Sequence, residues 1–309
     1  MAHTPAPLTE LIKINDQNLS DVDGITDLLL DAPVIQSMQA DFASNGTKHS
    51  YLKETKAPVV GFRVINDGRD HDHSEDTKVE LDLGLLDCSF HVDQAFADEY
   101  KRGREAWLTR EANRHLRAGF AKAEEQLFYG TTADGDASGF TGIADALGTL
   151  ATPMVMDAGG TLNLSSVYAI RNTEMDALLI TGNEGNISMG ATYQQMMAGS
   201  TTGSFNAYVT PCYAHLGVQV GSIHSIGRLA NLDGGANSLT DEMLSSLLSL
   251  FPAGRGPQFF AMTRRSRQQL QASRTATNAT GAPAPFPTEA FGVPIVTTDR
   301  ISNDETAVA

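Results

Sequence analysis

The sequence of 309 residues is poor in cysteine and contains no long apolar run. Cys88 and Cys212 are its two cysteines; they lie far apart and lack the spacing of metal ligands. This indicates free thiols and a reducing compartment rather than a disulfide framework. No apolar run reaches about 18 residues, so no helix is expected to span a membrane. The N-terminal residues show no pattern of a secretory signal.

Basic residues are also scarce, because 22 Lys and Arg face 37 Asp and Glu, which gives a net charge of −15. Such a surface repels polyphosphates, so a sequence-specific reader of nucleic acid is not expected. The sequence has no G-x-S-x-G nucleophile elbow, no phosphate-binding P-loop and no dinucleotide-binding glycine pattern. These absences predict a protein that is not an enzyme and that uses no cofactor.

Hydrophobic residues make up 41% and charged residues 19%, which is typical of a folded chain of about two domains. Residues 51–92 predict a long β-hairpin, because VVGFRVIN and TKVELDLGLLDCSFHV are both β-rich. An isolated hairpin is marginally stable in water, so we expect another chain to support it. Residues 1–50 predict an arm of short helical pieces, LTELIKIN, ITDLLL and PVIQSMQADF. These pieces also need a surface to lie on, and we expect neighbouring copies of the chain to provide it.

The segment DGRDHDHSED, residues 67–76, is the densest group of charges in the predicted hairpin. On a strand, His71 and His73 would share one face. A zinc site needs three or four converging ligands, and the sequence offers no clear third one. We therefore favour a charged hairpin tip that meets a partner subunit, with a metal site as the alternative. Because histidine titrates near neutral pH, the two side chains would make assembly depend on pH.

Residues 94–129 contain no proline and predict one long helix that ends before Gly130. Its apolar stripe shifts by one position between Trp107 and Leu108, which predicts different neighbours at the two ends. Three arginines recur at i, i+4 and i+7, and another three begin a later helix: Arg110, Arg114 and Arg117, then Arg264, Arg265 and Arg267. Two interpretations stay open, namely pairing within the chain and salt bridges to an acidic partner subunit.

The remaining sequence predicts a glycine-rich turn region, DASGFTGIADAL, then several β-rich stretches. An amphipathic helix is expected over 239–251, with Ser238 or Thr240 as its N-cap. PQFFAMTRRSRQQLQASR predicts a strand that runs into a helix, and FGVPIVTTDRI predicts a final strand.

In this order, the stretches resemble a tailed-bacteriophage major capsid protein of the Hong Kong 97-like fold. KAPVVGFRVINDGRD resembles the rising strand of the extended loop, and FHVDQAFADEYKRGREAWLTREANRHLRAGFAKAEEQLFYG resembles the spine helix. DASGFTGIADAL resembles the passage into the main body, and FFAMTRRSRQQLQ with FPTEAFGVPIVTTDRI resembles part of the axial domain. HLGVQVGSIHSIGRLANL precedes the axial helices, as in the branch with permuted strand order.

The resemblance implies an α+β fold with several parts. These are an N-terminal arm (1–50), an extended β-hairpin loop (51–92), a peripheral domain with a long spine helix (93–150 and 205–235), a β-rich insertion or peripheral/axial segment (151–204), and an axial domain (236–309). The candidate subunit-interface residues are Arg69, Asp70, His71, Asp72, His73, Glu75, Asp76, Arg110, Arg114 and Arg117.

The resemblance also implies a function. Copies of the chain would form the pentamers and hexamers of an icosahedral virion shell around double-stranded DNA, assembled in the host bacterial cytoplasm. Scaffolding, portal and decoration proteins would be its partners, with no membrane and no cofactor. The alternatives are an encapsulin-like nanocompartment shell, a metal-dependent enzyme using His71 and His73, and another virion part such as a tail or decoration protein.

Overall fold

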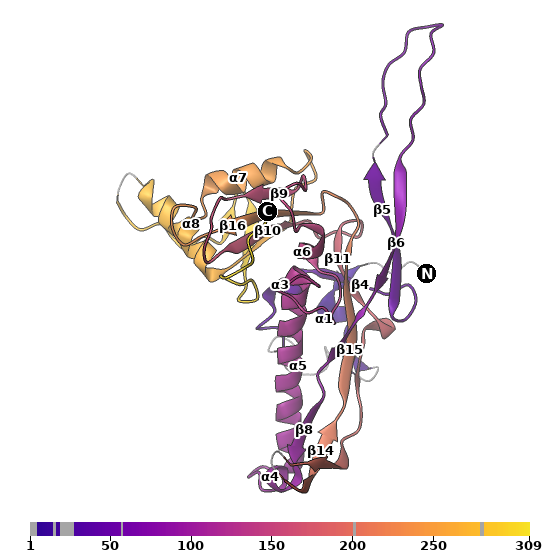
Figure 1. Ribbon diagram of the computed structural model, residues 1–309, viewed down its shortest axis with the longest axis vertical. Helices are drawn as coiled ribbons and strands as arrows, with labels where there is room; N and C mark the ends of the chain where they lie inside the picture. Colours follow the sequence, from indigo (N-terminus) through magenta and orange to yellow (C-terminus); the bar gives the residue numbers. More distant parts are fainter. Residues whose placement is uncertain (1–4, 15–16, 19–27, 57, 200–201, 279–280) are drawn as a thin grey trace.

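The computed structural model describes residues 5–14, 17–18, 28–56, 58–199, 202–278 and 281–309. Figure 1 shows a long helix, α5, that runs down the molecule beside strand β15, with a lobe carrying α7 and α8 near its upper end. A two-stranded hairpin projects far beyond both parts. The molecule therefore has a spine lobe, a second lobe and one extended arm-like hairpin.

The helices of the described residues are α1 (Leu8–Leu11), α3 (Pro33–Ser37), α4 (Gln94–Asp98), α5 (Arg104–Tyr129), α6 (Ile143–Ala146), α7 (Asp241–Ser249) and α8 (Arg264–Ala276), with a 3-10 turn, η2 (Asn183–Gly185). Within this part of the chain, every helix is too short or too polar to cross a membrane.

An eight-stranded sheet forms the spine lobe. Its order is β1 (Ala6–Pro7), β4 (Gln39–Phe42), β11 (Ala177–Thr181), β15 (Cys212–Val220), β12 (Asn186–Met189), β2 (Lys13–Ile14) and β3 (Gln17–Asn18), with β7 (Gly84–Asp87) also on β15. A three-stranded sheet, β13 (Tyr193–Ala198), β14 (Ser204–Thr210) and β8 (Phe90–Asp93), lies at the far end of α5 (Figure 1).

A six-stranded sheet forms the second lobe. Its order is β18 (Glu289–Ala290), β19 (Val293–Thr297), β17 (Phe259–Met262), β10 (Ser165–Ile170), β16 (Ile226–Leu232) and β9 (Val155–Asp157). Every residue of β10, β16 and β17 is buried, so both faces of these strands are covered, and the polar Arg228 and Asn231 within them are hydrogen-bonded. Thr240 caps α7 by accepting a bond from the Met243 amide at 3.3 Å, so Thr240 is the N-cap of the two that the sequence allowed.

The spine differs from the single helix expected over 94–129. Two helices, α4 and α5, are separated at Gly103, whose φ of 88° favours glycine. The Asp93 side chain caps α4 by accepting a bond from the Ala95 amide at 2.9 Å. The prediction of one unbroken helix is therefore wrong. Glycine disfavours a helix interior, and the effect of Gly103 on the helical pattern was not considered.

Helix α5 has two sets of neighbours, as expected, but the change comes after Ala112 and not between Trp107 and Leu108. Trp107 and Leu108 pack with Phe90 and Tyr208 in a small separate cluster, whereas Leu116, Phe120 and Leu127 belong to the main core. The helix ends at Tyr129 with Gly130 as its cap, as the sequence indicated. Beyond the cap, the buried amide of Gln126 organises the glycine-rich loop by donating to the Gly130 and Phe140 carbonyls, both at 2.7 Å.

The described part of residues 1–50 corrects a second expectation. Strand β4 pairs in parallel with β11, with Ala40 opposite Leu179, and β2 pairs with β12. Leu8, Val34 and Met38 are fully buried in the main core of their own chain. For these residues, the expectation that the segment needs a neighbouring chain as its surface is wrong. Part of the predicted helical piece ITDLLL, residues 25–27, lies outside the described residues.

The strands also group differently from the expected ranges. The hairpin consists of β5 (Lys48–Lys56) and β6 (Glu75–Asp82), whereas β7 and β8, inside the range 51–92, pair with strands of the body. The range 205–235 divides between lobes, because β14 and β15 lie along the spine and β16 pairs with β10. The alternation of apolar and polar residues predicts a strand, but it does not determine which sheet that strand joins.

Candidate subunit-contact surfaces

The hairpin is the first candidate surface, and its regular pairing covers only its base. Strands β5 and β6 pair from Lys48–Asp82 to Lys56–Glu75. Residues 58–74 continue without strand structure as two limbs: a rising limb that leads from β5 to the tip, and a returning limb that leads from the tip to β6. The limbs meet at a turn in which the Asp67 amide donates to the Val64 carbonyl at 3.1 Å. The prediction of a strand over VVGFRVIN is therefore wrong. DGRDHDHSED starts at the tip but mostly forms the returning limb.

Charged side chains bridge the two limbs where the backbone ladder is missing. The Arg69 guanidinium donates to the carbonyls of Val59 at 2.7 Å and Gly61 at 3.1 Å. On the returning limb, Asp72 accepts bonds from Lys56 Nζ at 2.9 Å and from the Val59 amide at 3.2 Å. The hydrogen bond from Lys56 lowers the pKa of Asp72. Two of the predicted interface residues thus hold their own hairpin together.

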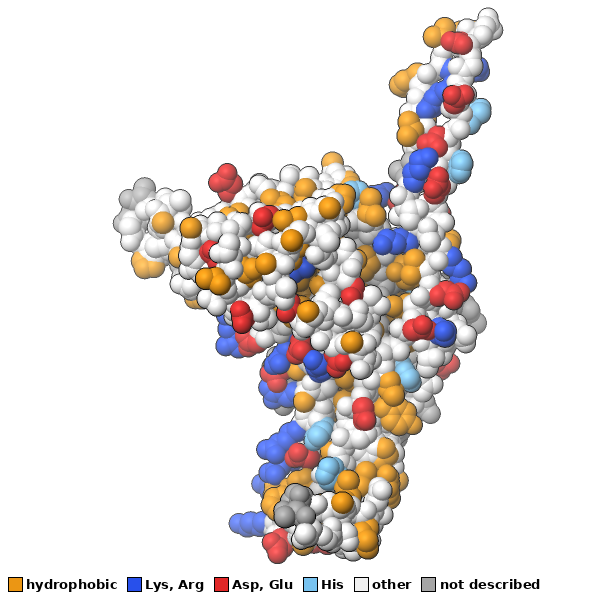
Figure 2. Space-filling view, viewed as in Figure 1, with side chains coloured by type: hydrophobic (Ala, Val, Ile, Leu, Met, Phe, Trp, Pro, Cys, Tyr) orange, Lys and Arg blue, Asp and Glu red, His pale blue; other side chains and the backbone are white. Residues whose placement is uncertain are grey.

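The other predicted residues of this segment are exposed. Glu75 lies 3.8 Å from Lys56 Nζ, and the side chains of Asp70, His71, His73 and Asp76 face solvent. Charges of both signs alternate along the hairpin in Figure 2. Among the described residues, no group of three or more His, Cys, Asp or Glu is arranged to hold a metal ion. These exposed side chains therefore contribute charge to the surface of the hairpin rather than a metal site.

The rising limb carries a feature that the sequence analysis did not single out. Five large apolar side chains on it are exposed: Val59, Val60, Phe62, Val64 and Ile65. Large exposed apolar side chains that gather on one segment usually mark a contact with another molecule. The signal was present in VVGFRVIN, but this stretch was interpreted only as a β-rich strand of the hairpin. We refer to these five residues as the apolar limb.

The arginine row on α5 is the second candidate surface, and each member contacts its own chain. Arg110 lies 5.0 Å above the Tyr100 ring. Arg114 lies 3.3 Å from Glu111. Arg117 forms a two-point ion pair with Asp31 at 2.5 and 3.1 Å, and this hydrogen bonding lowers the pKa of Asp31. Pairing within the chain accounts for these contacts, and the role of the row between subunits stays a prediction.

The second arginine cluster also has local partners. Arg264 pairs with Asp299. Arg267 donates to the Pro287 carbonyl at 2.8 Å and lies 4.8 Å above the Phe286 ring. These contacts attach α8 to the loop that precedes β18 and to the segment that follows β19.

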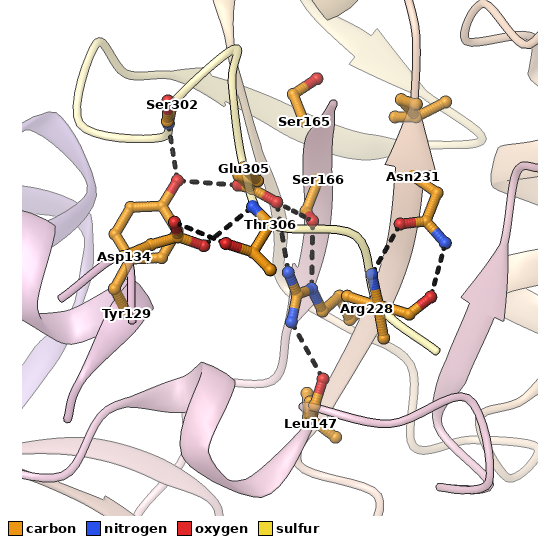
Figure 3. A network of polar contacts seen from close by, with 12 residues as sticks. Tyr129, Asp134, Leu147, Ser165, Ser166, Arg228, Asn231, Ser302, Glu305 and Thr306 are labelled. Atoms are coloured by element: carbon orange, nitrogen blue, oxygen red, sulfur yellow. Dashed lines mark hydrogen bonds and ion pairs between the residues drawn. The ribbon is translucent and has the colours of Figure 1, made fainter. Parts of the chain in front are cut away.

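A buried ion pair lies in the second lobe where that lobe meets the end of α5, and the sequence analysis missed it. The Arg228 guanidinium on β16 lies 3.2 Å from the Glu305 carboxylate, and both side chains are almost completely buried. Glu305 also accepts bonds from Ser166 at 2.5 Å and from Tyr129, the last residue of α5, at 2.7 Å. In Figure 3 these groups converge on the carboxylate. Burial raises the pKa of Glu305, and the neighbouring Arg228 opposes that effect.

Glu124 on α5 makes a second buried junction. Its carboxylate accepts bonds from the amides of Val34 at 2.8 Å and Ile35 at 3.0 Å, and from the Thr298 hydroxyl. Burial raises the pKa of Glu124 to about 7, although these donors oppose the shift. One side chain therefore connects the spine helix, the N-terminal segment and the C-terminal part of the chain. Both junctions are saturated with internal partners, so they hold the fold together rather than present a reactive group.

A sequence profile of the family described as major capsid protein GP7 matches residues 18–309. The chain belongs to this family. No curated protein matches the sequence. Among solved structures, the bacteriophage Epsilon15 structure is similar at 19% identity and a TM-score of 0.58, with 96% of this chain and 92% of that chain covered. The capsid of bacteriophage JBD30 is 10% identical, with a TM-score of 0.49 and coverage of 91% and 94%.

Membership of the GP7 family confirms the predicted identity as a major capsid protein of tailed phages, a structural protein of the virion capsid. The likeness to the Epsilon15 structure, together with the mixed helices and strands, confirms the predicted α+β capsid fold of the Hong Kong 97-like type. The family thereby favours a phage shell over the nanocompartment, tail-protein and metal-enzyme alternatives.

Proposed function

We propose that this capsid subunit assembles into pentamers and hexamers of an icosahedral shell, with each hairpin lying across a neighbouring copy. The apolar limb is the observation that supports this most directly. Five large apolar side chains stand in solvent on a hairpin that projects away from its own body (Figure 1). Burying one such side chain contributes about 1.5–3 kcal/mol, so partial coverage by a neighbour would already stabilise a contact.

The braces within the hairpin support the same proposal. Arg69 and Asp72 hold the limbs together before any neighbour is met. A pre-ordered hairpin loses less conformational entropy on docking than a flexible one. The exposed Asp70, His71, His73, Glu75 and Asp76 would then face polar or basic groups of the neighbouring copy. Arg110 and Arg114, which are exposed on α5, are candidates for such groups.

The shell would enclose double-stranded DNA without reading its sequence. The net charge of −15 supports this, since a wall with few cations has few phosphate contacts and releases few counterions. We further propose that assembly takes place in the host cytoplasm with portal, scaffolding and decoration proteins as partners. We also propose that the subunit acts purely as a structural protein and catalyses no reaction.

Shortening the hairpin tests the proposal. Residues 58–74 would be replaced by a short Asn-Gly turn, which leaves β5 and β6 paired. The expected result is a folded subunit that no longer yields closed shells in electron microscopy. The variant Leu162→Ser is the matched control, because Leu162 is exposed on the body rather than on the hairpin. Closed shells from the shortened variant at the yield of the unaltered chain would contradict the proposal.

A further inference from the structure

Cys88 and Cys212 lie directly opposite each other, although 124 positions separate them in the sequence. Strand β7 pairs with β15 so that Asp87 faces Tyr213, and β8 pairs with β14 so that Phe90 faces Thr210. The same antiparallel register runs through both ladders, and continuing it across the junction places Cys88 opposite Cys212. The Cys88 amide indeed donates to the Cys212 carbonyl at 2.7 Å.

The two side chains also meet. Both residues are buried, and the interaction between the two thiols raises the pKa of Cys88 and lowers the pKa of Cys212. Residues directly opposite in an antiparallel pair have Cα atoms about 4.5–5.5 Å apart. That distance falls within the usual range for a disulfide. The spine helix closes over the pair at Gly119, where an added Cβ would lie 2.3 Å from Cys88 Sγ.

From this juxtaposition we propose that Cys88 and Cys212 form a latent intramolecular disulfide, which closes when the folded protein meets a small-molecule disulfide as oxidant. The bond would crosslink the β7–β8 segment to the facing β14–β15 segment, at the junction between the eight-stranded and three-stranded sheets. In a reducing cytoplasm the pair stays as thiols. The proposal concerns the folded chain itself and does not depend on how shells assemble.

The local structure supplies an attacking thiol and a point of entry. The neighbouring Cys88 thiol lowers the pKa of Cys212, so Cys212 is the thiol that more readily forms a thiolate. Pro211, which has no amide hydrogen, lies beside Cys212 and interrupts the backbone ladder between β14 and β15. A break of this kind opens more easily than a continuous ladder, and opening is what a buried thiol needs to reach a reagent.

The exchange balances in two steps. The Cys212 thiolate attacks one sulfur of the reagent disulfide, forms a mixed disulfide and releases one reagent thiolate. Cys88, after losing its proton to that thiolate, attacks the Cys212 sulfur and releases the second reagent thiol. Two protein thiols are oxidised to one disulfide, and one reagent disulfide is reduced to two thiols.

The test uses the full chain, purified with a reductant, freed of it and treated with hydroxyethyl disulfide. The remaining thiols are then alkylated, and the peptides are analysed by mass spectrometry without reduction. The expected product is a linked pair of peptides that contain Cys88 and Cys212, in a chain that still migrates as a monomer. The midpoint of thermal unfolding should rise on oxidation, because the crosslink restrains the unfolded chain. Adding dithiothreitol should reverse the rise.

Two single variants are the controls. In Cys88→Ser and in Cys212→Ser, the remaining thiol has no partner in the chain, so any product is a reagent adduct and oxidation should not raise the midpoint. Three results with the unaltered chain would overturn the proposal. They are thiols that stay unreacted in the folded protein, reagent adducts on both cysteines without a link, and disulfide-linked dimers in place of the internal bond.

Discussion

At the scale of single residues, Glu124 links folding to pH. Its pKa is raised to about 7 by burial, against 4.5 for an ordinary glutamate. The folded state therefore favours the neutral carboxyl. The contribution of Glu124 to the free energy of unfolding is complete below about pH 4.5 and is lost as the pH rises through about 7. The full contribution is on the order of 3 kcal/mol. We predict that the free energy of unfolding of the subunit falls between about pH 5 and about pH 8.

Glu124→Gln is the variant that isolates this effect. The amide keeps the shape and one acceptor oxygen but does not titrate, so the pH dependence of its unfolding free energy should be weaker. Urea unfolding of both chains at several pH values measures the difference. Equal slopes for the two chains would show that Glu124 does not titrate in this range.

His71 and His73 carry a prediction about assembly rather than folding. Both are exposed on the returning limb of the hairpin, where they contact a neighbour if the hairpin docks as proposed. We predict that replacing both by Asn shifts the pH profile of shell formation, because histidine gains its charge near neutral pH. Light scattering during assembly across a pH series provides the readout. An unchanged profile would remove the two residues from the docking contact.

At the scale of elements, the packing of α5 against the sheet depends on Gly119. A methyl group there would lie 2.3 Å from Cys88 Sγ. We predict that Gly119→Ala destabilises the subunit by about 1–3 kcal/mol from overpacking, although alanine is favoured over glycine in a helix by about 1 kcal/mol. Equilibrium unfolding in guanidinium measures the change.

The clash at Gly119 is testable because its partner atom can be removed. In the double variant with Cys88→Ala, the sulfur is gone and the added methyl has room. The double variant should therefore recover much of the loss caused by Gly119→Ala, which a double-mutant cycle separates from additive effects. Purely additive losses would mean that the contact with Cys88 is not what excludes a side chain at residue 119.

Local patterns explain which elements the sequence predicted correctly. The end of α5 at Gly130 and the Thr240 cap depend on a few adjacent residues, and both were accessible to pattern reasoning. The break at Gly103 was equally local and was overlooked. The position of the hairpin tip was not accessible in this way. It depends on where β5 and β6 stop pairing, and side-chain braces such as Arg69 to Val59 take over beyond that point.

At the scale of the whole molecule, the buried polar contacts near the junction of the lobes connect residues far apart in sequence. Arg228 and Glu305 have unremarkable sequence surroundings, and nothing in either stretch indicates the other. The same is true of Glu124, whose partners come from residues 34–35 and 298. Charge alone gives no partner, so these junctions required the structure. The candidate interface residues were found because they cluster locally, and their contacts with other subunits stay predictions.

The Arg228–Glu305 pair also makes a prediction at this scale. Glu305→Ala leaves the Arg228 guanidinium buried without its carboxylate, which should cost about 3–5 kcal/mol. Arg228→Met in the same chain removes the stranded charge and should restore part of that stability. Thermal and chemical unfolding of both variants give the comparison. If Glu305→Ala unfolds like the unaltered chain, the pair does not stabilise the fold.

The most direct test of the account is negative-stain electron microscopy of the full chain expressed alone, beside its elution in size-exclusion chromatography. The account predicts closed shells, or rings of subunits that elute far above the 33.0 kDa of one chain. A well-behaved monomer, both alone and with a scaffolding protein, would contradict the claim that this chain builds a shell from copies of itself.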